Sequence, residues 1–218
     1  MITTSAFRVD LALAILASIY QLIGWHLILA KPFGNPYLSI ERIVTVPSGE
    51  TVREAILNAA EVRARAAGYN GFSFRELAAD VGIKSASVHY HFPTKADLAL
   101  ALMDRYRAKA LDFLGEQHDA PAALERLIAL FRLAAMQSEM CLCGALGASS
   151  QDLPPAVQSS AAQFSDALVN WLYAAPDAKA ALPLPPETIV ALLEGALLLS
   201  VTKQRADFFE AAIRPLSA

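Results

Sequence analysis

The chain has 218 residues, of which 55% are hydrophobic and 18% charged, and its net charge is −3. This composition excludes a mainly disordered chain, because the charged share is below the ~25% of an average globular protein and there is ample apolar surface to bury. The only two cysteines, Cys141 and Cys143, exclude a disulfide scaffold and suit a reducing compartment, so we expect a cytoplasmic protein.

Residues 1–46 form an apolar N-terminal extension that ends in segments rich in Pro and Gly. Within it, residues 11–30 run for 20 positions without a formal charge, which is long enough to cross a hydrocarbon core of about 30 Å. Three interpretations are open: a membrane anchor, a helix packed on the rest of the chain or on a partner, or a segment outside the working protein, with Val44 or Val46 as its first residue. We expect a chain that begins at Val46 to fold and function unaided.

Residues 47–115 contain the signals of several helix starts and stops. Thr51 and Ser73 each stand three residues before a glutamate, which is the spacing of a capping box. Gly68 is placed to end the first helix, and Thr94, after Pro93, begins a longer helix that runs to about residue 115. The pattern therefore predicts an N-terminal domain of three short helices followed by a connecting helix.

The second and third of these helices, 74–81 and 85–92, are joined by a tight turn centred on Gly82, and this pairing predicts a helix-turn-helix. The helix at 85–92 carries hydroxyl, imidazole and phenol groups but few large aliphatic side chains, so its polar face suits phosphates and base edges. We expect this segment to contact double-stranded DNA. The candidate DNA-binding residues are Ser73, Arg75, Lys84, Ser85, Ser87, His89, Tyr90, His91 and Lys95.

The sequence ILNAAEVRARAAGYNGFSFRELAADVGIKSASVHYHFPTKADL resembles the DNA-binding domain of the TetR family of bacterial transcriptional regulators, and the resemblance covers residues 51–110. It implies an all-α fold: a three-helix N-terminal helix-turn-helix domain and a C-terminal helical domain for ligand binding and dimerisation. Family members are homodimers that repress genes until a small molecule binds. The chain departs from many relatives at His89, where they carry Tyr, and before residue 51, where Glu50 stands in place of a basic arm.

Other interpretations of the candidate residues are open. Tyr90 can be a core residue, and Arg75, Lys84 and Lys95 can be ordinary surface charges. A metal site at the two flanking histidines is not expected, because positions i and i+2 of a helix point to different faces and no third ligand is near.

Residues 116–218 carry 6 basic and 11 acidic side chains, a balance that argues against a polyanionic partner. Apolar spacing predicts helices at 121–138, 156–174, 187–203 and 206–216. The helix at 187–203 is apolar nearly all round except for Glu194, which predicts burial on more than one side. We expect the last two helices to pair with a second copy in a four-helix bundle; a monomeric core is the alternative.

A small-molecule effector is expected to bind between the helices at 121–138, 156–174 and 187–203, because ligand sites in helical domains form between packed helices. The candidate ligand-binding residues are Phe131, Met136, Cys141, Phe164 and Trp171.

The segment around Cys141 and Cys143 is similar to that of TetR-type repressors that respond to electrophiles such as N-ethylmaleimide or to acrylate. The resemblance implies that Cys141, and not Cys143, is the sensor. A helix N-terminus would lower the pKa of the thiol, whereas Glu139 would raise it. The alternatives are two buried cysteines that only pack, or a two-ligand metal site that lacks its remaining ligands.

The C-terminal half has no phosphate-binding glycine loop, nucleophile elbow or metal cluster, so we expect neither an enzyme nor a cofactor. The predicted function is a ligand-responsive repressor that a small molecule releases from a palindromic DNA operator. The alternatives are a membrane-tethered DNA-binding or interaction protein that uses residues 11–30, and a helical binding module with no role at DNA.

Overall fold

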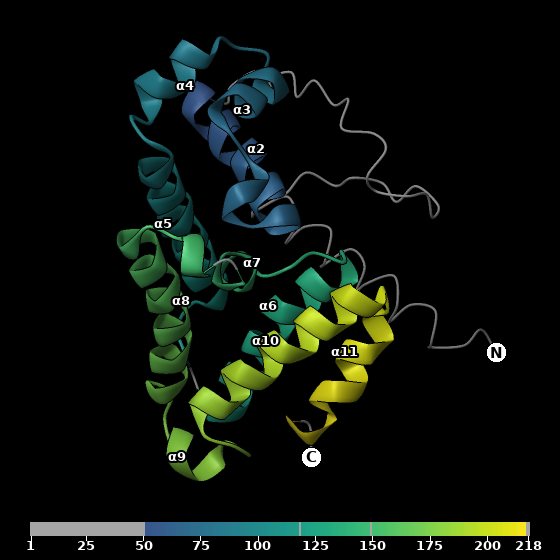
Figure 1. The fold of residues 1–218 in the computed structure, drawn as a ribbon. Coiled ribbons are helices and arrows are strands. Elements are labelled where there is room, and N and C mark those ends of the chain that lie inside the picture. Colours follow the sequence, from purple (N-terminus) through teal and green to yellow (C-terminus); the bar gives the residue numbers. More distant parts are fainter. Residues whose placement is uncertain (1–50, 118, 149, 217–218) are drawn as a thin grey trace, which may run out of the picture. The chain divides into compact units, whose positions relative to one another are not determined.

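The computed structural model describes residues 51–117, 119–148 and 150–216. Within these ranges the chain forms ten α-helices and no strand, which confirms the predicted all-α fold class (Figure 1). The expectations for residues 1–46, including the apolar run at 11–30, lie outside the described residues.

The N-terminal helices begin and end at the predicted capping residues. Thr51 and Ser73 accept hydrogen bonds from backbone N–H groups three residues on, and Gly68 and Gly82 end their helices with positive φ angles of 68° and 73°. These signals are local, which is why they can be identified in the sequence. The elements are α2 (Val52–Ala67), the 3₁₀ turn η2 (Tyr69–Gly71), α3 (Phe74–Val81) and α4 (Ser85–His91).

Helix α5 (Lys95–Leu114) connects the two halves of the described chain. Thr94 and Asp97 form a full capping box at its start, and Gly115 ends it with a φ of 61°. The helix contacts α2 on one side of the predicted domain boundary and the helices α6 (Ala120–Met136) and α8 (Pro155–Tyr173) on the other. A single rigid element therefore packs against both halves.

The C-terminal half is a bundle in which α6, α8 and α10 (Pro186–Lys203) pack together, with α11 (Ala206–Ile213) alongside α10 (Figure 1). Its buried side chains include Leu127, Phe164, Leu193 and Phe209. The shorter elements of this half are α7 (Leu142–Gly147), η3 (Ser150–Asp152), α9 (Ala178–Ala181) and η4 (Arg214–Leu216).

Two details differ from the sequence-based prediction. The last helix, expected at 206–216, is α-helical only to Ile213 and continues as the 3₁₀ turn η4, because Pro215 has no N–H to continue the helix. The short helix α9 lies in a region for which the sequence predicted no helix, between Pro176 and the prolines before α10.

Candidate DNA interface and buried polar cluster

The α3–α4 pair is held by a glycine turn and a small apolar contact. Gly82 lies in the left-handed region, and its N–H bonds back to the last turn of α3. Ser73 caps α3: its Oγ accepts a hydrogen bond from the N–H of Glu76 at 3.3 Å. Leu77 of α3 and Val88 of α4 are fully buried. Because Val88 is the only buried residue of α4, the rest of the described helix faces outward or lies at the surface.

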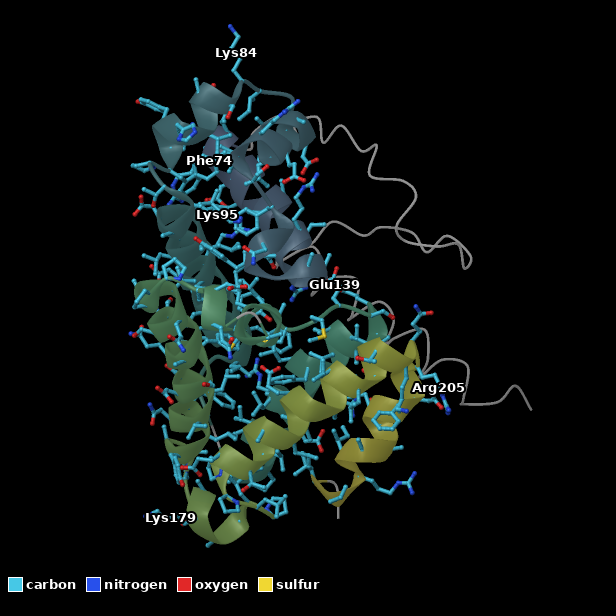
Figure 2. All side chains as sticks on the ribbon, viewed as in Figure 1. Phe74, Lys84, Lys95, Glu139, Lys179 and Arg205 are labelled. Carbon is cyan, nitrogen blue, oxygen red and sulfur yellow. The ribbon has the colours of Figure 1, made fainter. Side chains whose placement is uncertain are left out.

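Most of the predicted DNA-binding residues lie on this outward surface. Tyr90 is 85% exposed, so it is not a core residue. Lys84 precedes α4 and projects away from the turn (Figure 2). The exposed members of the set are Ser73, Arg75, Lys84, His89 and Tyr90, and the half-buried members are Ser85, Ser87, His91 and Lys95.

An open hollow of about 350 Å³ lies beside α4. Tyr90 and His91, which both line it, form a T-shaped contact with 5.2 Å between ring centroids; His89, which is not among the lining residues, forms a T-shaped contact with Phe74 at 4.6 Å. The surface thus combines hydroxyl and imidazole groups with an apolar floor. The lining residues are Val52, Ile83, Ala86, Ser87, Tyr90 and His91.

Lys95 is placed differently from the other candidate residues. Its Nζ lies 4.5 Å from the ring centre of Tyr69 and 4.6 Å from that of Phe72. Partial burial lowers the pKa of Lys95, and Glu76 acts in the opposite direction. The ammonium group therefore stabilises the junction between η2 and α5, and it would have to leave the two rings to reach a phosphate.

The predicted effector-binding residues do not all lie together. Phe131, Cys141, Phe164 and Trp171 are buried, whereas Met136, at the end of α6, is 60% exposed. Phe164 packs on the ring of Tyr106 at 5.0 Å between centroids. The Trp171 indole N–H donates to the carbonyl of Gly115 at 2.8 Å and so anchors the connection from α5 to α6.

The two cysteines are enclosed by hydrogen-bonding neighbours. The Tyr106 hydroxyl lies 3.7 Å from the Cys141 Sγ, and the Cys143 thiol donates to the carbonyl of Ala161 at 3.1 Å. Burial, followed by the neighbouring Cys143, raises the pKa of Cys141 well above its ordinary value. Cys141 does precede α7 at its N-terminus, but burial outweighs that position. The structure therefore favours a protonated, packed thiol over a reactive thiolate.

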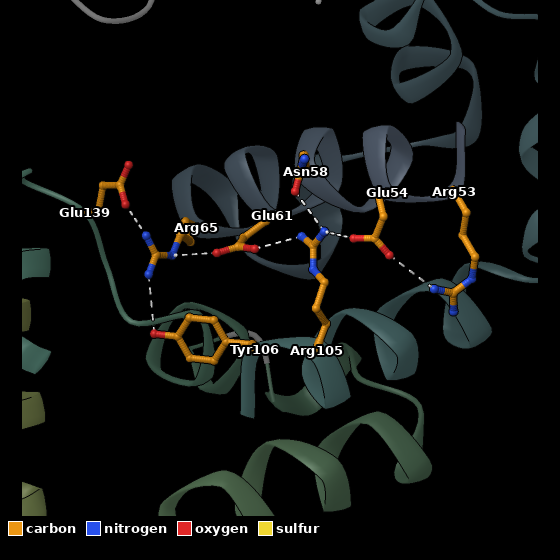
Figure 3. Close-up of polar contacts among 8 residues, drawn as sticks. All are labelled: Arg53, Glu54, Asn58, Glu61, Arg65, Arg105, Tyr106 and Glu139. Carbon is orange, nitrogen blue, oxygen red and sulfur yellow. Dashed lines mark hydrogen bonds and ion pairs between the residues drawn. The ribbon is translucent and has the colours of Figure 1, made fainter. Parts of the chain in front are cut away.

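A buried polar cluster around Arg65 was not predicted from the sequence (Figure 3). The guanidinium of Arg65, on α2, donates to the Tyr106 hydroxyl on α5 at 3.4 Å and forms a short ion pair with Glu139, in the segment between α6 and α7. Glu61 lies 3.9 Å away on the same helix. Burial opposes the charge of Arg65, but Tyr106, Glu139 and Glu61 outweigh burial and raise its pKa.

A second arginine extends this cluster along α2. Arg105 of α5 donates to Glu54 at 3.0 Å, to Asn58 at 2.8 Å and to Glu61 at 2.8 Å (Figure 3). Together with the contacts of Arg65, these bonds join α2 to α5 and to the segment before α7. Polar residues of α2 therefore contact the C-terminal half, which we also call the effector half, as well as the helix-turn-helix domain.

Glu194 was marked by the sequence as the single charge in an apolar helix. Its Oε1 is shielded from solvent and has no hydrogen-bond partner among the described residues. Burial, followed by the nearby Cys141, raises the pKa of Glu194 well above its ordinary value. The Arg65 partners Tyr106 and Glu139 gave no comparable signal, because they lie 41 and 74 residues away in the chain.

None of the helices that the structure describes is long and apolar enough to cross a membrane. Across the same ranges, no three His, Cys, Asp or Glu side chains gather into a group that could hold a metal ion.

Comparisons with known proteins place the fold. The family model described as bacterial regulatory proteins, tetR family, matches residues 56–102, a span from α2 into α5. No curated protein matches the sequence. A TetR transcriptional regulator from Legionella pneumophila has a similar structure, with 28% identity and a TM-score of 0.67 over 77% of this chain and 96% of the other.

A TetR-family regulator from Agrobacterium tumefaciens is similar at 26% identity and a TM-score of 0.66, over 75% of this chain and 94% of the other. The reduced form of NemR from E. coli shares the fold at 22% identity and a TM-score of 0.60, over 74% and 92% of the two chains. The family model thus covers the helix-turn-helix, and nearly whole family members align with both halves of the described chain. Residues 56–102 therefore match the tetR family model, and the described chain has the fold of TetR-family regulators, an N-terminal helix-turn-helix followed by a helical C-terminal half.

Proposed function

We propose that this chain is a TetR-family repressor that binds a palindromic DNA operator as a homodimer and leaves it when a small molecule binds the C-terminal half. The observation that carries the proposal is helix α4, which has one buried side chain and an outward surface of hydroxyl, imidazole and phenol groups. A helix with this surface, following a tight turn, suits the major groove of DNA.

We assign the residues of this surface to two kinds of contact. Four are proposed to contact base edges or the adjacent backbone: Lys84, Ser85, Ser87 and Tyr90. The others are proposed to hold phosphates: Ser73, Arg75, His89, His91 and Lys95. The contact of Lys95 requires its ammonium to leave Tyr69 and Phe72, so we rank Lys84 above it as a source of charge toward DNA.

The dimer is proposed to form through α10 and α11. Leu198 and Leu199 of α10 are 47% and 45% exposed in the single chain, although α10 already packs on α6, α8 and α11. Adjacent exposed leucines on a helix favour contact with another apolar surface. A second copy of the same helices supplies one and produces the two-fold symmetry of a palindromic operator.

The effector is proposed to bind among the buried side chains between α6, α8 and α10, where Phe131, Cys141, Phe164 and Trp171 lie. The route to the DNA-binding helices is the polar contact of Arg65 with Tyr106 and Glu139. A ligand that favours another arrangement of these contacts would shift the population of dimers away from the DNA-binding form.

We infer a cytoplasmic protein without enzymatic activity or cofactor, as its TetR-family fold suggests. The alternative of a membrane-tethered protein depends on residues 11–30 and has no support in the described chain. Fractionation of cells that express the full chain separates the two, because a tethered protein sediments with membranes.

A salt titration with matched lysine variants tests the DNA contact. Lys84 and Lys179 are both exposed, and they lie on the helix-turn-helix and on α9 respectively (Figure 2). Lys84→Ala should weaken binding to a duplex enriched from a random pool and reduce the slope of log K against log salt by about one. Lys179→Ala should change neither. Equal slopes for the wild type and Lys84→Ala would contradict the proposed interface.

A further inference from the structure

We propose that Glu194 is the carboxyl group that binds the effector, and that the effector is a small organic cation of the amine class. This inference rests on the proposed function, since it names the chemistry of the ligand to which the repressor responds. The observations that carry it are the enclosure of Glu194 and its lack of a cationic partner.

One oxygen of the Glu194 carboxyl group is enclosed and unsatisfied, although the residue as a whole is half-buried. This oxygen, Oε1, is shielded from solvent and has no hydrogen-bond partner among the described residues. Leaving a buried polar atom unpaired destabilises the folded state, so such atoms are rare in folded proteins and call for an explanation. On a helix that is otherwise apolar from residue 189 to residue 199, an aliphatic side chain would pack without this cost.

Among the described residues, the neighbours of the carboxyl group supply no positive charge. Gly144 of α7 faces Glu194 so closely that a Cβ there would lie only 3.2 Å from its Oε2, so the missing side chain at position 144 makes space for the Glu194 carboxyl group itself. The thiol of Cys141 is the other neighbour of the carboxyl group, and it contributes to the raised pKa of Glu194. Arg65, which lies beyond Tyr106 in the chain of contacts from Cys141, is already paired with Glu139.

The charged groups on the helices packed against α10 are also engaged or exposed elsewhere. Arg132 of α6 pairs with Glu210 of α11, and Arg205 pairs with Asp207. The remaining charged side chains of α6 and α8 are exposed: Glu125, Arg126 and Asp166. Among the described residues, the contacts that lead from Glu194 through Cys141 to Tyr106 thus contain a thiol and a phenol but no cation without a carboxylate partner.

An amine completes this site chemically. Burial raises the pKa of Glu194 well above its ordinary value, which favours the protonated carboxyl when the site is empty. When an ammonium group binds, the carboxyl releases its proton to solvent, and the carboxylate pairs with the ammonium, which keeps its own protons. The rings of Tyr106 and Phe164, tilted by 43° with their centroids 5.0 Å apart, provide an aromatic surface near the thiol for the body of the ligand.

The same position gives the ligand a path to the DNA-binding half. Cys141 contacts both Glu194 and the Tyr106 hydroxyl, and that hydroxyl also accepts a hydrogen bond from Arg65 of α2. A ligand that pairs with Glu194 removes a hydrogen-bonding partner of the Cys141 thiol, and this in turn alters the contact of the thiol with Tyr106. The contact between Tyr106 of α5 and Arg65 of α2 is then the first contact with the DNA-binding half to change.

The test uses the purified full chain and isothermal calorimetry with methylamine, butylamine and phenethylamine, and with phenethyl alcohol and phenylacetate as neutral and anionic counterparts. At least one amine should bind, with release of about one proton per site, as measured in two buffers of different ionisation enthalpy. While the carboxyl is protonated, affinity should rise by up to about tenfold per pH unit, because binding releases a proton.

Glu194→Gln should lower the affinity for that amine by at least about tenfold, the loss expected when a buried charge partner is removed, and should abolish proton release. Glu125→Gln, an exposed acid of α6, is the matched control and should bind like the wild type. Circular dichroism checks the fold of both variants. The proton release of the wild type remains a test if Glu194→Gln does not fold.

The inference is overturned if none of the three amines binds, if phenethyl alcohol binds as tightly as phenethylamine, or if Glu194→Gln keeps its affinity. Operator binding measured on the same samples separates the two proposals. A chain that binds DNA but no amine retains the proposed function and loses this inference. A chain that binds an amine but no duplex loses the proposed function.

Discussion

Arg65 is the residue at which three parts of the chain meet. It belongs to α2, donates to Tyr106 of α5 and pairs with Glu139 before α7. The Arg65 side chain is 8% exposed and that of Glu61 is 11% exposed, so the ion pairs are shielded from solvent more than ordinary surface pairs are. We infer that this side chain helps to fix the position of α2 relative to the effector half.

Replacing Arg65 with Met should destabilise the protein by stranding its acidic partners. Met keeps an unbranched apolar stem, but Glu139 loses its cation and Glu61 keeps only its pair with Arg105. Breaking a buried pair costs about 3–5 kcal/mol, and because Glu139 is partly exposed we expect a smaller loss of about 2 kcal/mol in the free energy of unfolding. Urea unfolding measures it.

Arg205→Met is the matched control, since the pair of Arg205 with Asp207 is exposed on both sides. It should unfold at the same urea concentration as the wild type. An Arg65→Met variant that also unfolds with the wild type would show that the cluster does not hold α2 in place.

At the scale of single elements, the turn between α3 and α4 depends on one backbone conformation. Gly82 has a φ of 73°, and a Cβ at this position would meet nothing within 4 Å. A side chain at this position therefore costs free energy because of the left-handed backbone conformation, and not because it would collide with neighbouring residues. This makes Gly82 a clean probe of how the turn positions α4.

Gly82→Ala should lower the free energy of unfolding by about 1 kcal/mol, the usual cost of a left-handed conformation for a residue with a Cβ. Gly147→Ala is the matched control, because Gly147 also faces open space but lies in helix α7. Its stability should stay the same or rise slightly, as Ala favours helix. Thermal unfolding of both variants measures the difference. Equal unfolding midpoints would contradict the proposed conformational cost of a side chain at position 82.

The sequence predicted the elements of this fold better than their long-range contacts. Thr51, Ser73 and Thr94 are confirmed as helix caps, because capping depends on residues three positions apart. The pairing of Arg65 with Glu139 joins positions 74 residues apart and leaves no local signal. The same holds for Lys95, whose packing on Tyr69 and Phe72 depends on how η2 meets α5.

At the scale of the whole molecule, the proposed repressor needs two recognition helices at a fixed separation. Within the described chain, α5 contacts both α2 and the effector-half helices, so a change near the effector site has a short path to α4. The exposed Leu198 and Leu199 of α10 are the proposed surface for the second copy. Release from DNA then follows if ligand binding alters the separation of the two α4 helices.

The most direct test of the proposed function is selection of duplexes from a random DNA pool by the purified full chain at moderate salt. A dimer that places two α4 helices in successive major grooves should enrich a palindrome whose half-sites are about one helical turn apart. Enrichment of no sequence over the starting pool, or of a sequence without two-fold symmetry, would contradict it.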